Sequence, residues 1–161
     1  MTRLYKISFL FLALIFAVSA TSSAQTSKYK CMIQMTNYMG EGAYITLSLI
    51  DSKGNYEKTL YVLGSDKKWY KTLKEWYQFQ SKKPANLSAI TGASVTGGDR
   101  SVNVIEIETA KINAGYKLRF ESAVEDKPYN VKDLEIPLTT ETLAAKSDGT
   151  GYIRYVRFSA N

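Results

Sequence analysis

The fold of this chain is decided by residues 43–63, which read AYITLSLIDSKGNYEKTLYVL. In the first part of this stretch, side chains alternate between two faces: Ala43, Ile45, Leu47 and Leu49 on one, and Tyr44, Thr46 and Ser48 on the other. A period of two is typical of a strand that buries one face. Residues 51–55 then have the composition of a turn, because Gly54 can adopt positive φ and Asp51 can bond its own backbone. Residues 56–63 are therefore predicted to return as the second strand of a hairpin.

The same alternation recurs on both sides of this hairpin. Further strands are predicted near residues 29–35, 102–109, 116–121, 134–138 and 152–158. Pro137 favours an edge position, because proline cannot donate to a strand ladder. In the second of these strands the apolar positions shift phase between Val102/Val104 and Ile105/Ile107, which indicates a bulge. About eight short strands at regular spacing predict a mostly β protein, an immunoglobulin-like β-sandwich.

One segment has the period of a helix instead. Trp69, Leu73 and Trp76 are spaced i, i+4 and i+7, and Tyr70 and Tyr77 widen the same stripe. This spacing predicts an amphipathic helix of about three turns, with Ser65 or Asp66 as its N-cap and its end before Pro84. The aromatic stripe has two interpretations: packing against a sheet, or an aromatic wall beside a ligand.

The N-terminal segment is typical of a secretory signal peptide. Arg3 and Lys6 precede an apolar run over residues 7–18, and small residues follow as far as Ala24. We therefore predict a signal peptide over residues 1–24 and a single β-sandwich domain over residues 25–161. Cleavage after Ala20 and an uncleaved membrane anchor are the alternatives. The apolar run is shorter than the ~20 residues of a spanning helix, so the exported chain is expected not to span the membrane.

The residues before the one cysteine exclude a lipoprotein. Lys28-Tyr29-Lys30 precede Cys31, where a lipid-accepting cysteine needs small or apolar neighbours. Cys31 is instead predicted to be a buried apolar residue of a strand. Export of the chain therefore predicts a periplasmic protein.

The composition excludes several kinds of chemistry. The chain has 161 residues, no histidine, one cysteine and a formal net charge of +6. Without histidine, Ser-His-Asp and Cys-His catalysis are excluded, and the commonest metal ligand is missing. One cysteine forms neither an intrachain disulfide nor a cysteine zinc site. Because basic residues cluster only in pairs such as Lys67-Lys68 and Lys82-Lys83, no nucleic-acid interface is expected. We expect a protein without a metal and without catalytic residues of its own.

The long segment from Pro84 to Arg100 contains the one chemically suggestive sequence. A loop of this length is uncommon in a compact domain and is often functional. Within it, Gly92 and Ala93 permit close approach to the backbone, and Ser94 would present an accessible hydroxyl for covalent modification. The alternative is an ordinary loop, since threonine, glycine and serine are common in any loop.

Thr91-Gly92-Ala93-Ser94 resembles the Ser/Thr-Gly-Ala-Ser/Thr acceptor motif of covalently flavinylated bacterial proteins, such as the FMN-binding domains of sodium-pumping quinone reductase. In that family a flavin transferase joins FMN through a phosphodiester to the last hydroxyl residue, which corresponds to Ser94 here. The family usually has aspartate three positions before the motif, where this chain has Ser88. The resemblance implies a covalent FMN cofactor bound by Thr91, Gly92, Ala93 and Ser94.

A wider resemblance extends over about residues 40 to 140. It rests on the following segments: Gly42-Ala43-Tyr44-Ile45-Thr46-Leu47-Ser48-Leu49, Asp51-Ser52-Lys53-Gly54, Lys58-Thr59-Leu60, Trp69-Tyr70, Leu73-Lys74, Trp76-Tyr77, Ile90-Thr91-Gly92-Ala93-Ser94 and Asn113-Ala114-Gly115-Tyr116-Lys117-Leu118. They are similar to a family of predicted periplasmic proteins of unknown function, whose fold is similar to the immunoglobulin-like domain of a flagellar hook-capping protein. Such families are often encoded near PepSY membrane proteins and flavin transferases, which implies these two kinds of partner.

Two functions follow as hypotheses. The first is a periplasmic electron carrier with covalent FMN, in which the flavin supplies the redox chemistry. Its ring would stack on Trp69, Tyr70, Trp76 or Tyr77, and Arg100 or Lys82 would neutralise its phosphate.

The second hypothesis is a non-catalytic immunoglobulin-like module of the cell envelope, with Tyr44, Tyr61 or Tyr152 in an outward row. A hydrolase that uses Glu106 and Glu108 is a weaker third reading, because two carboxylates on one strand face are usually solvated charges.

Overall fold

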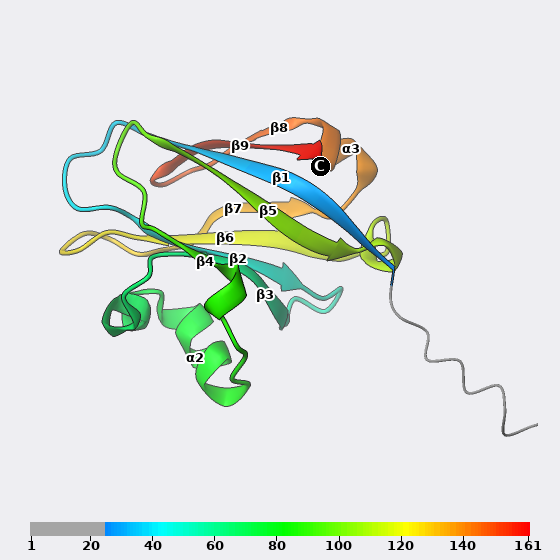
Figure 1. Cartoon of the computed structure of the whole chain (residues 1–161), viewed down its shortest axis with the longest axis horizontal. Coiled ribbons are helices and arrows are strands. Elements are labelled where there is room, and N and C mark those ends of the chain that lie inside the picture. The colour runs from blue at the N-terminus through cyan, green and yellow to red at the C-terminus, as the bar shows by residue number, and fades with distance from the viewer. Residues whose placement is uncertain (1–24) are drawn as a thin grey trace, which may run out of the picture.

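The computed structural model describes residues 25–161, which form two β-sheets packed face to face (Figure 1). One sheet has the strand order β5-β1-β9-β8: Arg100–Glu108, Thr26–Met35, Ile153–Ala160 and Lys146–Asp148. The other has the order β4-β3-β2-β6-β7: Thr91–Gly92, Tyr56–Leu63, Tyr44–Ile50, Lys117–Ala123 and Asn130–Pro137. The mostly β sandwich predicted from the sequence is confirmed, with nine strands instead of about eight. The signal peptide predicted for residues 1–24 lies outside the described residues.

The hairpin over residues 43–63 forms as the alternation predicted. β2 pairs with β3 antiparallel, and Gly54 in their turn has φ +89°. The Asp51 carboxylate accepts the backbone N–H groups of Lys53 and Asn55 at 2.9 and 2.8 Å, which closes the turn. The alternation and the turn residues therefore predicted this antiparallel hairpin correctly.

The core lies between the two sheets. Alternate residues of each long strand point into it, among them Ile33, Ile45, Phe120 and Val156. Cys31 is buried there as predicted, at 2% exposure, and burial raises the pKa of its thiol well above the usual value. A thiol in that state packs as a small apolar group rather than acting as a nucleophile.

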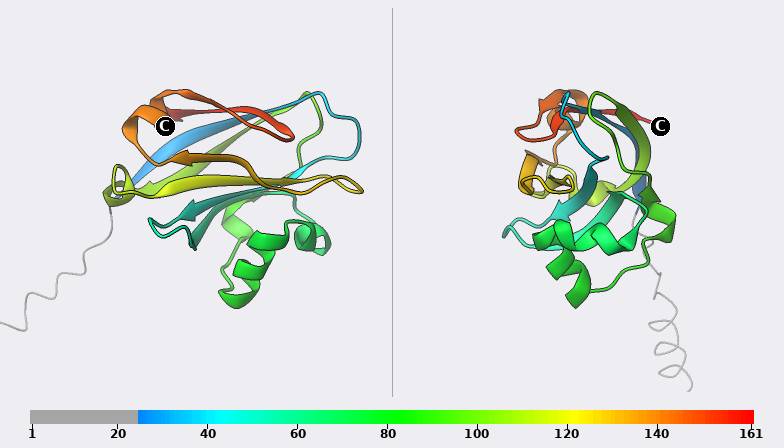
Figure 2. Two further views of the ribbon diagram at one scale, coloured as in Figure 1. Left: turned by 180° about the vertical axis from the view of Figure 1, so that it is seen from behind. Right: turned by 90° about the vertical axis from the view of Figure 1, so that its left-hand side faces the viewer.

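A helical layer covers the outer face of the five-stranded sheet (Figures 1 and 2). The predicted single helix is two pieces, the 3-10 helix η1 (Lys67–Thr72) and the α-helix α2 (Lys74–Lys82), which join at Leu73. The Asp66 side chain caps the first piece, as predicted. Tyr70, Leu73 and Trp76 are buried, and the indole N–H of Trp76 donates to Thr59 Oγ1 at 2.9 Å. For these three residues, packing against the sheet is the correct interpretation of the stripe.

This layer buries polar side chains that the alternation predicts to face outward. Thr46, Ser48, Arg119 and Glu121 are each at most 6% exposed. The Glu121 carboxylate accepts hydrogen bonds from the hydroxyl groups of Tyr56 (2.6 Å) and Tyr129 and from the backbone N–H of Trp76 (3.3 Å). Burial raises the pKa of Glu121. These side chains do point away from the core between the sheets, as the alternation predicts. They are nevertheless buried, because the alternation within a strand gives no information about which elements cover its outer face.

The predicted edge strand and the predicted bulge have different outcomes. β7, which contains Pro137, lies at the edge of its sheet, so that prediction is confirmed. The bulge in residues 102–109 is wrong, because β1 and β5 pair in continuous register from Thr26↔Glu108 to Gln34↔Arg100. Val102 and Val104 are instead exposed on the outer face, at 56% and 47%. The phase shift in the sequence therefore marks a strand with apolar residues on both faces.

Three short helices complete the chain: η2 (Ser88–Ile90), η3 (Thr109–Lys111) and α3 (Thr140–Ala144). Within residues 25–161 no helix has both the length and the apolar character that crossing a membrane requires.

Candidate functional site

The segment that carries Ser94 joins the two sheets of the sandwich. After η2 the chain enters β4, which pairs in parallel with the end of β3 through Val62↔Thr91 and Leu63↔Gly92. The Thr91 hydroxyl donates to Leu87 O at 2.7 Å, so this side chain supports the local turn. Thr91 and Gly92 therefore hold the start of the segment in place rather than presenting reactive groups.

The backbone is held again directly after Ser94. Val95 and Ala43 exchange hydrogen bonds, Ala43 N to Val95 O at 2.7 Å and Val95 N to Ala43 O at 3.1 Å. The Tyr38 hydroxyl donates to Val95 O at 2.7 Å and accepts the N–H of Ala43 at 2.8 Å. Ser94 is thus an exposed residue on a backbone that is hydrogen-bonded on both sides.

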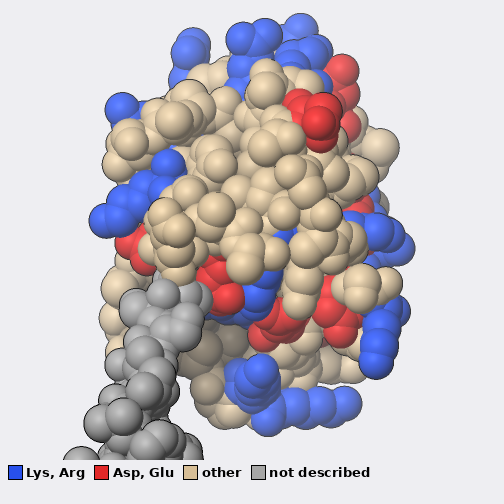
Figure 3. Space-filling view, turned by 90° about the vertical axis from the view of Figure 1, so that its right-hand side faces the viewer, with Lys and Arg blue, Asp and Glu red and all other residues tan. Residues whose placement is uncertain are grey.

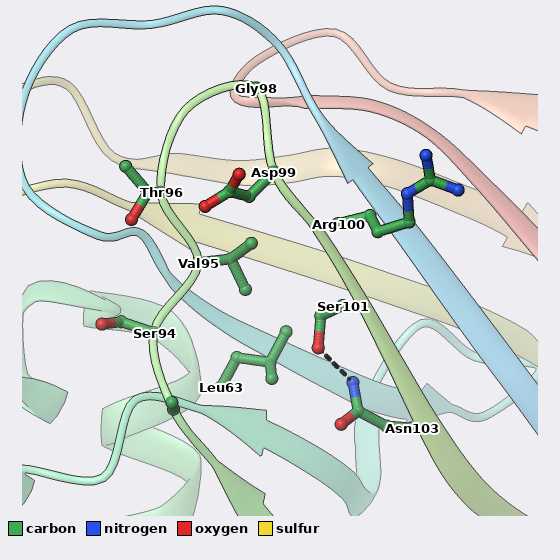
Figure 4. Close-up of a pocket in the computed structure, with 10 residues that line it drawn as sticks. Leu63, Ser94, Val95, Thr96, Gly98, Asp99, Arg100, Ser101 and Asn103 are labelled. Atoms are coloured by element: carbon green, nitrogen blue, oxygen red, sulfur yellow. Dashed lines mark hydrogen bonds between the residues drawn. The ribbon is translucent and has the colours of Figure 1, made fainter.

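The Ser94 side chain lies against the backbone of Gly42. A Cβ at position 42 would be 2.6 Å from Ser94 Oγ and 3.0 Å from Ser94 Cβ, so only glycine leaves room there. Within residues 25–161 the Ser94 hydroxyl has no hydrogen-bond partner. Figure 4 shows it directed away from Ser101 and Asn103. An exposed hydroxyl on a fixed backbone is the geometry that an acceptor of a modifying group requires.

Ser94 lines two hollows at once. The larger, about 510 Å³, lies between the segment and β5; Leu63, Ala93, Val95, Thr96, Gly98, Asp99, Arg100, Ser101 and Asn103 complete its lining (Figure 4). The smaller, about 150 Å³, lies on the side of the helical layer and includes Gly42, Tyr44 and Trp69. The larger volume is within the ~300–1,000 Å³ of small-molecule sites, whereas the smaller one is below it.

Only some of the residues that the sequence suggested for flavin contacts line a hollow together with Ser94. Trp69 lines the smaller hollow and Arg100 the larger, so each shares a hollow with Ser94. Tyr70 and Trp76 are buried in the helical layer, and Lys82 lines a separate hollow with Tyr56 and Phe79. Those three residues are not beside Ser94. Tyr77 is 43% exposed on α2 and lines neither hollow.

Sequence reasoning missed several residues of this site. Gly42 and Tyr44 come from a segment about fifty positions before Ser94 and are brought close by the Ala43–Val95 bridge, whereas Asn103 lies on β5, the strand that follows Ser94 in the chain. The Gly42-Ala43 step before a clean strand was the one available signal, because small residues permit close backbone approach. Asp99 adds a negative charge to the larger hollow, opposite in sign to Arg100.

The other candidate groups have structural partners. Glu106 pairs with Lys28 at 3.3 Å and is a solvated strand charge, whereas Glu108 pairs with Lys111 at 3.2 Å in a half-buried ion pair. The outward tyrosine row is wrong: Tyr61 and Tyr152 pack against the main core, whereas Tyr44 contacts Tyr70 in the helical layer. Across the described part of the chain no group of three or more acidic or cysteine side chains is placed to hold a metal ion.

The charges on the surface are mixed. Figure 3 shows Lys and Arg interspersed with Asp and Glu over the end of the sandwich where the described chain begins. A mixed surface of this kind carries no extended basic footprint on that face.

Comparison with known proteins identifies a family but no characterised relative. The family model described as "Predicted periplasmic protein (DUF2271)" matches residues 26–155, nearly the whole described chain. No curated protein and no solved structure matches. The description agrees with the periplasmic location predicted from the N-terminal segment.

Proposed function

Because the chain belongs to this family of predicted periplasmic proteins, we propose that it is a periplasmic electron carrier that holds FMN covalently at Ser94. The proposal is supported above all by the Ser94 hydroxyl, which is exposed, without a hydrogen-bond partner in residues 25–161, and carried on a backbone held on both sides. It is supported further by the resemblance of residues 91–94 to a flavinylation motif.

The residues around Ser94 fit a flavin mononucleotide in size and chemistry. The hollow of about 510 Å³ has room for a ligand of this class. Arg100 is at the edge of this hollow with its side chain on the outer face of β5, so it would have to turn toward Ser94 to neutralise a phosphodiester, while Trp69 and Tyr44 offer aromatic surface on the other side of Ser94. FMN, when attached, supplies reversible electron transfer, for which no histidine or metal of the protein is needed.

The chain's own part in attachment is limited to one oxygen. Ser94 Oγ forms an ester bond to the FMN phosphorus while a pyrophosphate bond of a flavin dinucleotide donor breaks; a nucleoside monophosphate leaves and the hydroxyl proton passes to water. A separate flavin transferase must catalyse this exchange, because within residues 25–161 no base is hydrogen-bonded to Ser94. Gly42 keeps the hydroxyl accessible, and the Val95–Ala43 bonds keep its position fixed.

The partners proposed for this role are the flavin transferase and a membrane redox protein of the PepSY type. Both would have to approach the same side of the sandwich, where Ser94, Trp69 and Glu41 are exposed or half-buried. The protein itself is proposed not to be an enzyme, since it contributes orientation and charge rather than catalysis.

Intact-mass spectrometry tests the proposal directly. The exported chain is co-produced with a periplasmic flavin transferase, purified, denatured and washed. We expect a mass gain of one FMN minus water together with flavin absorbance; both are lost in Ser94→Ala and kept in Ser94→Thr. Ser88→Ala is the matched control, because Ser88 is an exposed serine of the same segment. An unmodified wild-type chain, or an equal gain in Ser94→Ala, would overturn it.

The alternative function, a non-catalytic binding module of the envelope, is favoured by a different observation. The outer face of β5 exposes Val102 and Val104 without cover from other residues of 25–161. The two functions are compatible, because neither Val102 nor Val104 lines a hollow beside Ser94.

A further inference from the structure

The edge strand β5 differs from the other three sheet edges of the molecule. β4 and β8 are only two and three residues long, and β7 is interrupted by a register shift and ends in Pro137. Short strands, irregular register and proline are the usual means of preventing edge-to-edge association. β5 has nine residues in continuous register with β1, and it contains neither proline nor lysine. It is the one edge in residues 25–161 that remains long and regular.

The free edge of β5 presents the backbone groups of its even-numbered residues. Asp99 O accepts from Met35 N, and Thr109 N donates to Gln25 O, so odd-numbered residues point their backbone groups toward β1. In an antiparallel ladder the N–H and C=O groups of one residue point to the same side, and consecutive residues alternate. The groups of Arg100, Val102, Val104 and Glu106 therefore point away from β1. Figure 2 shows β5 at the border of the sandwich.

The side chains of the same residues form a self-complementary row. Arg100, Val102, Val104 and Glu106 are all exposed on the outer face, in the order basic, apolar, apolar, acidic. If a second β5 lies antiparallel with Asn103 opposite its own copy, Arg100 is opposite Glu106 and Val102 is opposite Val104. Each pair then occurs twice, and every pair joins residues whose backbone groups point outward.

The neighbouring registers lack this match. A shift that places Val104 opposite its own copy sets Val102 against Glu106, which pairs an apolar side chain with a charge. A one-residue slip instead pairs outward-pointing with inward-pointing backbone groups and breaks the ladder. Charge and apolar pattern thus select a single register.

From these observations we propose that two copies of the chain associate through their β5 edges, in antiparallel register about Asn103, to form a continuous eight-stranded sheet. Such an interface is isologous, because the same strand serves both copies. The two-fold axis is normal to the shared sheet, so the second sheets of the two copies both lie on the same face of that shared sheet. Because Ser101 and Asn103 line the larger hollow beside Ser94, the two hollows face each other across the axis.

Sedimentation velocity on the exported chain and two charge-reversal variants tests this dimer. We expect the wild type to dimerise, and Arg100→Glu and Glu106→Arg each to be largely monomeric, since each sets like charges opposite one another in both pairs. An equimolar mixture of the two variants restores both pairs, so it is expected to form a heterodimer. Lys146→Glu is the control: it reverses an exposed charge on β8, the other edge of the same sheet, and leaves the dimer unchanged.

The backbone groups are tested separately. Val102→Pro removes an N–H that points away from β1, so the sandwich is expected to fold while the dimer dissociates. Circular dichroism and thermal unfolding of every variant confirm that the monomer is intact. A wild-type chain that stays monomeric into the sub-millimolar range, or a dimer that survives both single reversals, would overturn the proposal. So would a mixture of the two variants that remains monomeric.

Discussion

Ser94 and Gly42 are in such close contact that a Cβ on Gly42 would lie 2.6 Å from Ser94 Oγ. The two residues are 52 positions apart in the sequence, and they meet because their neighbours Ala43 and Val95 form an antiparallel backbone bridge. Whether the hydroxyl is available for attachment therefore depends on a residue outside the motif.

Gly42→Ala is expected to lower flavin attachment several-fold and to destabilise the fold by about 1 kcal/mol, because the new methyl group displaces the Ser94 side chain. Intact mass measures the first effect and urea unfolding the second. In a Ser94→Gly background the Oγ and Cβ are absent, so the stability cost of Gly42→Ala should largely vanish. An equal cost in both backgrounds would place the strain elsewhere.

Trp69→Ala is expected to leave the attached mass unchanged while altering the flavin's fluorescence, because Trp69 is the tryptophan that lines a hollow with Ser94. An indole beside an isoalloxazine ring quenches its emission, so the flavin should become brighter. Tyr77→Ala is the matched control, since Tyr77 is an exposed aromatic of the same layer that lines neither hollow. Equal spectra for both variants would contradict stacking on Trp69.

Glu121→Gln is expected to change how stability depends on pH. Burial raises the pKa of Glu121 in the folded protein, so its contribution to stability is fully present below its ordinary pKa near 4.5 and is lost as pH rises through the folded value. The variant does not titrate at this position, so its free energy of unfolding should improve relative to the wild type as pH rises above 4.5. Denaturant titrations across this range measure the difference. A difference in free energy of unfolding that does not change with pH would mean that the pKa of Glu121 is not raised.

Asp133→Ala is expected to destabilise the protein by roughly 3 kcal/mol or more, since several buried donors lose their acceptor together. The Asp133 carboxylate accepts backbone N–H groups from the turn before β9 and from the first residue of that strand: Gly151 at 2.7 Å, Tyr152 at 2.8 Å, Thr150 at 3.2 Å and Ile153 at 3.0 Å. Thermal unfolding provides the measurement, and Asp148→Ala, an exposed carboxylate nearby, is the control. Similar losses in the two variants would show that the turn does not depend on this acceptor.

Much of the sandwich could be predicted because strand alternation is a local property. The 43–63 hairpin, the edge position of Pro137, the cap at Asp66 and the burial of Cys31 all follow from near neighbours in sequence. β4 and β8 were missed because two or three residues show no period, and tertiary pairing alone makes them strands. The bulge was wrong for a related reason: apolar residues on both faces of β5 look like a change of phase.

The candidate site divides in the same way. Ser94 was identified from the four consecutive residues 91–94. The sequence as a whole suggested six possible flavin contacts, among them Trp69 and Arg100. Tertiary packing distinguishes these candidates: Tyr70 and Trp76 are buried against the five-stranded sheet, and Lys82 lines a different hollow.

By itself, the sequence determined the periplasmic destination, the mostly β class and the position of one accessible hydroxyl, because each of these follows from residues that are adjacent or regularly spaced in the chain. Only the tertiary structure decided which polar side chains are buried, which edge of the sandwich is free and which residues surround Ser94. Those properties depend on contacts between segments distant in sequence, and a period of two or 3.6 residues describes one element without its neighbours.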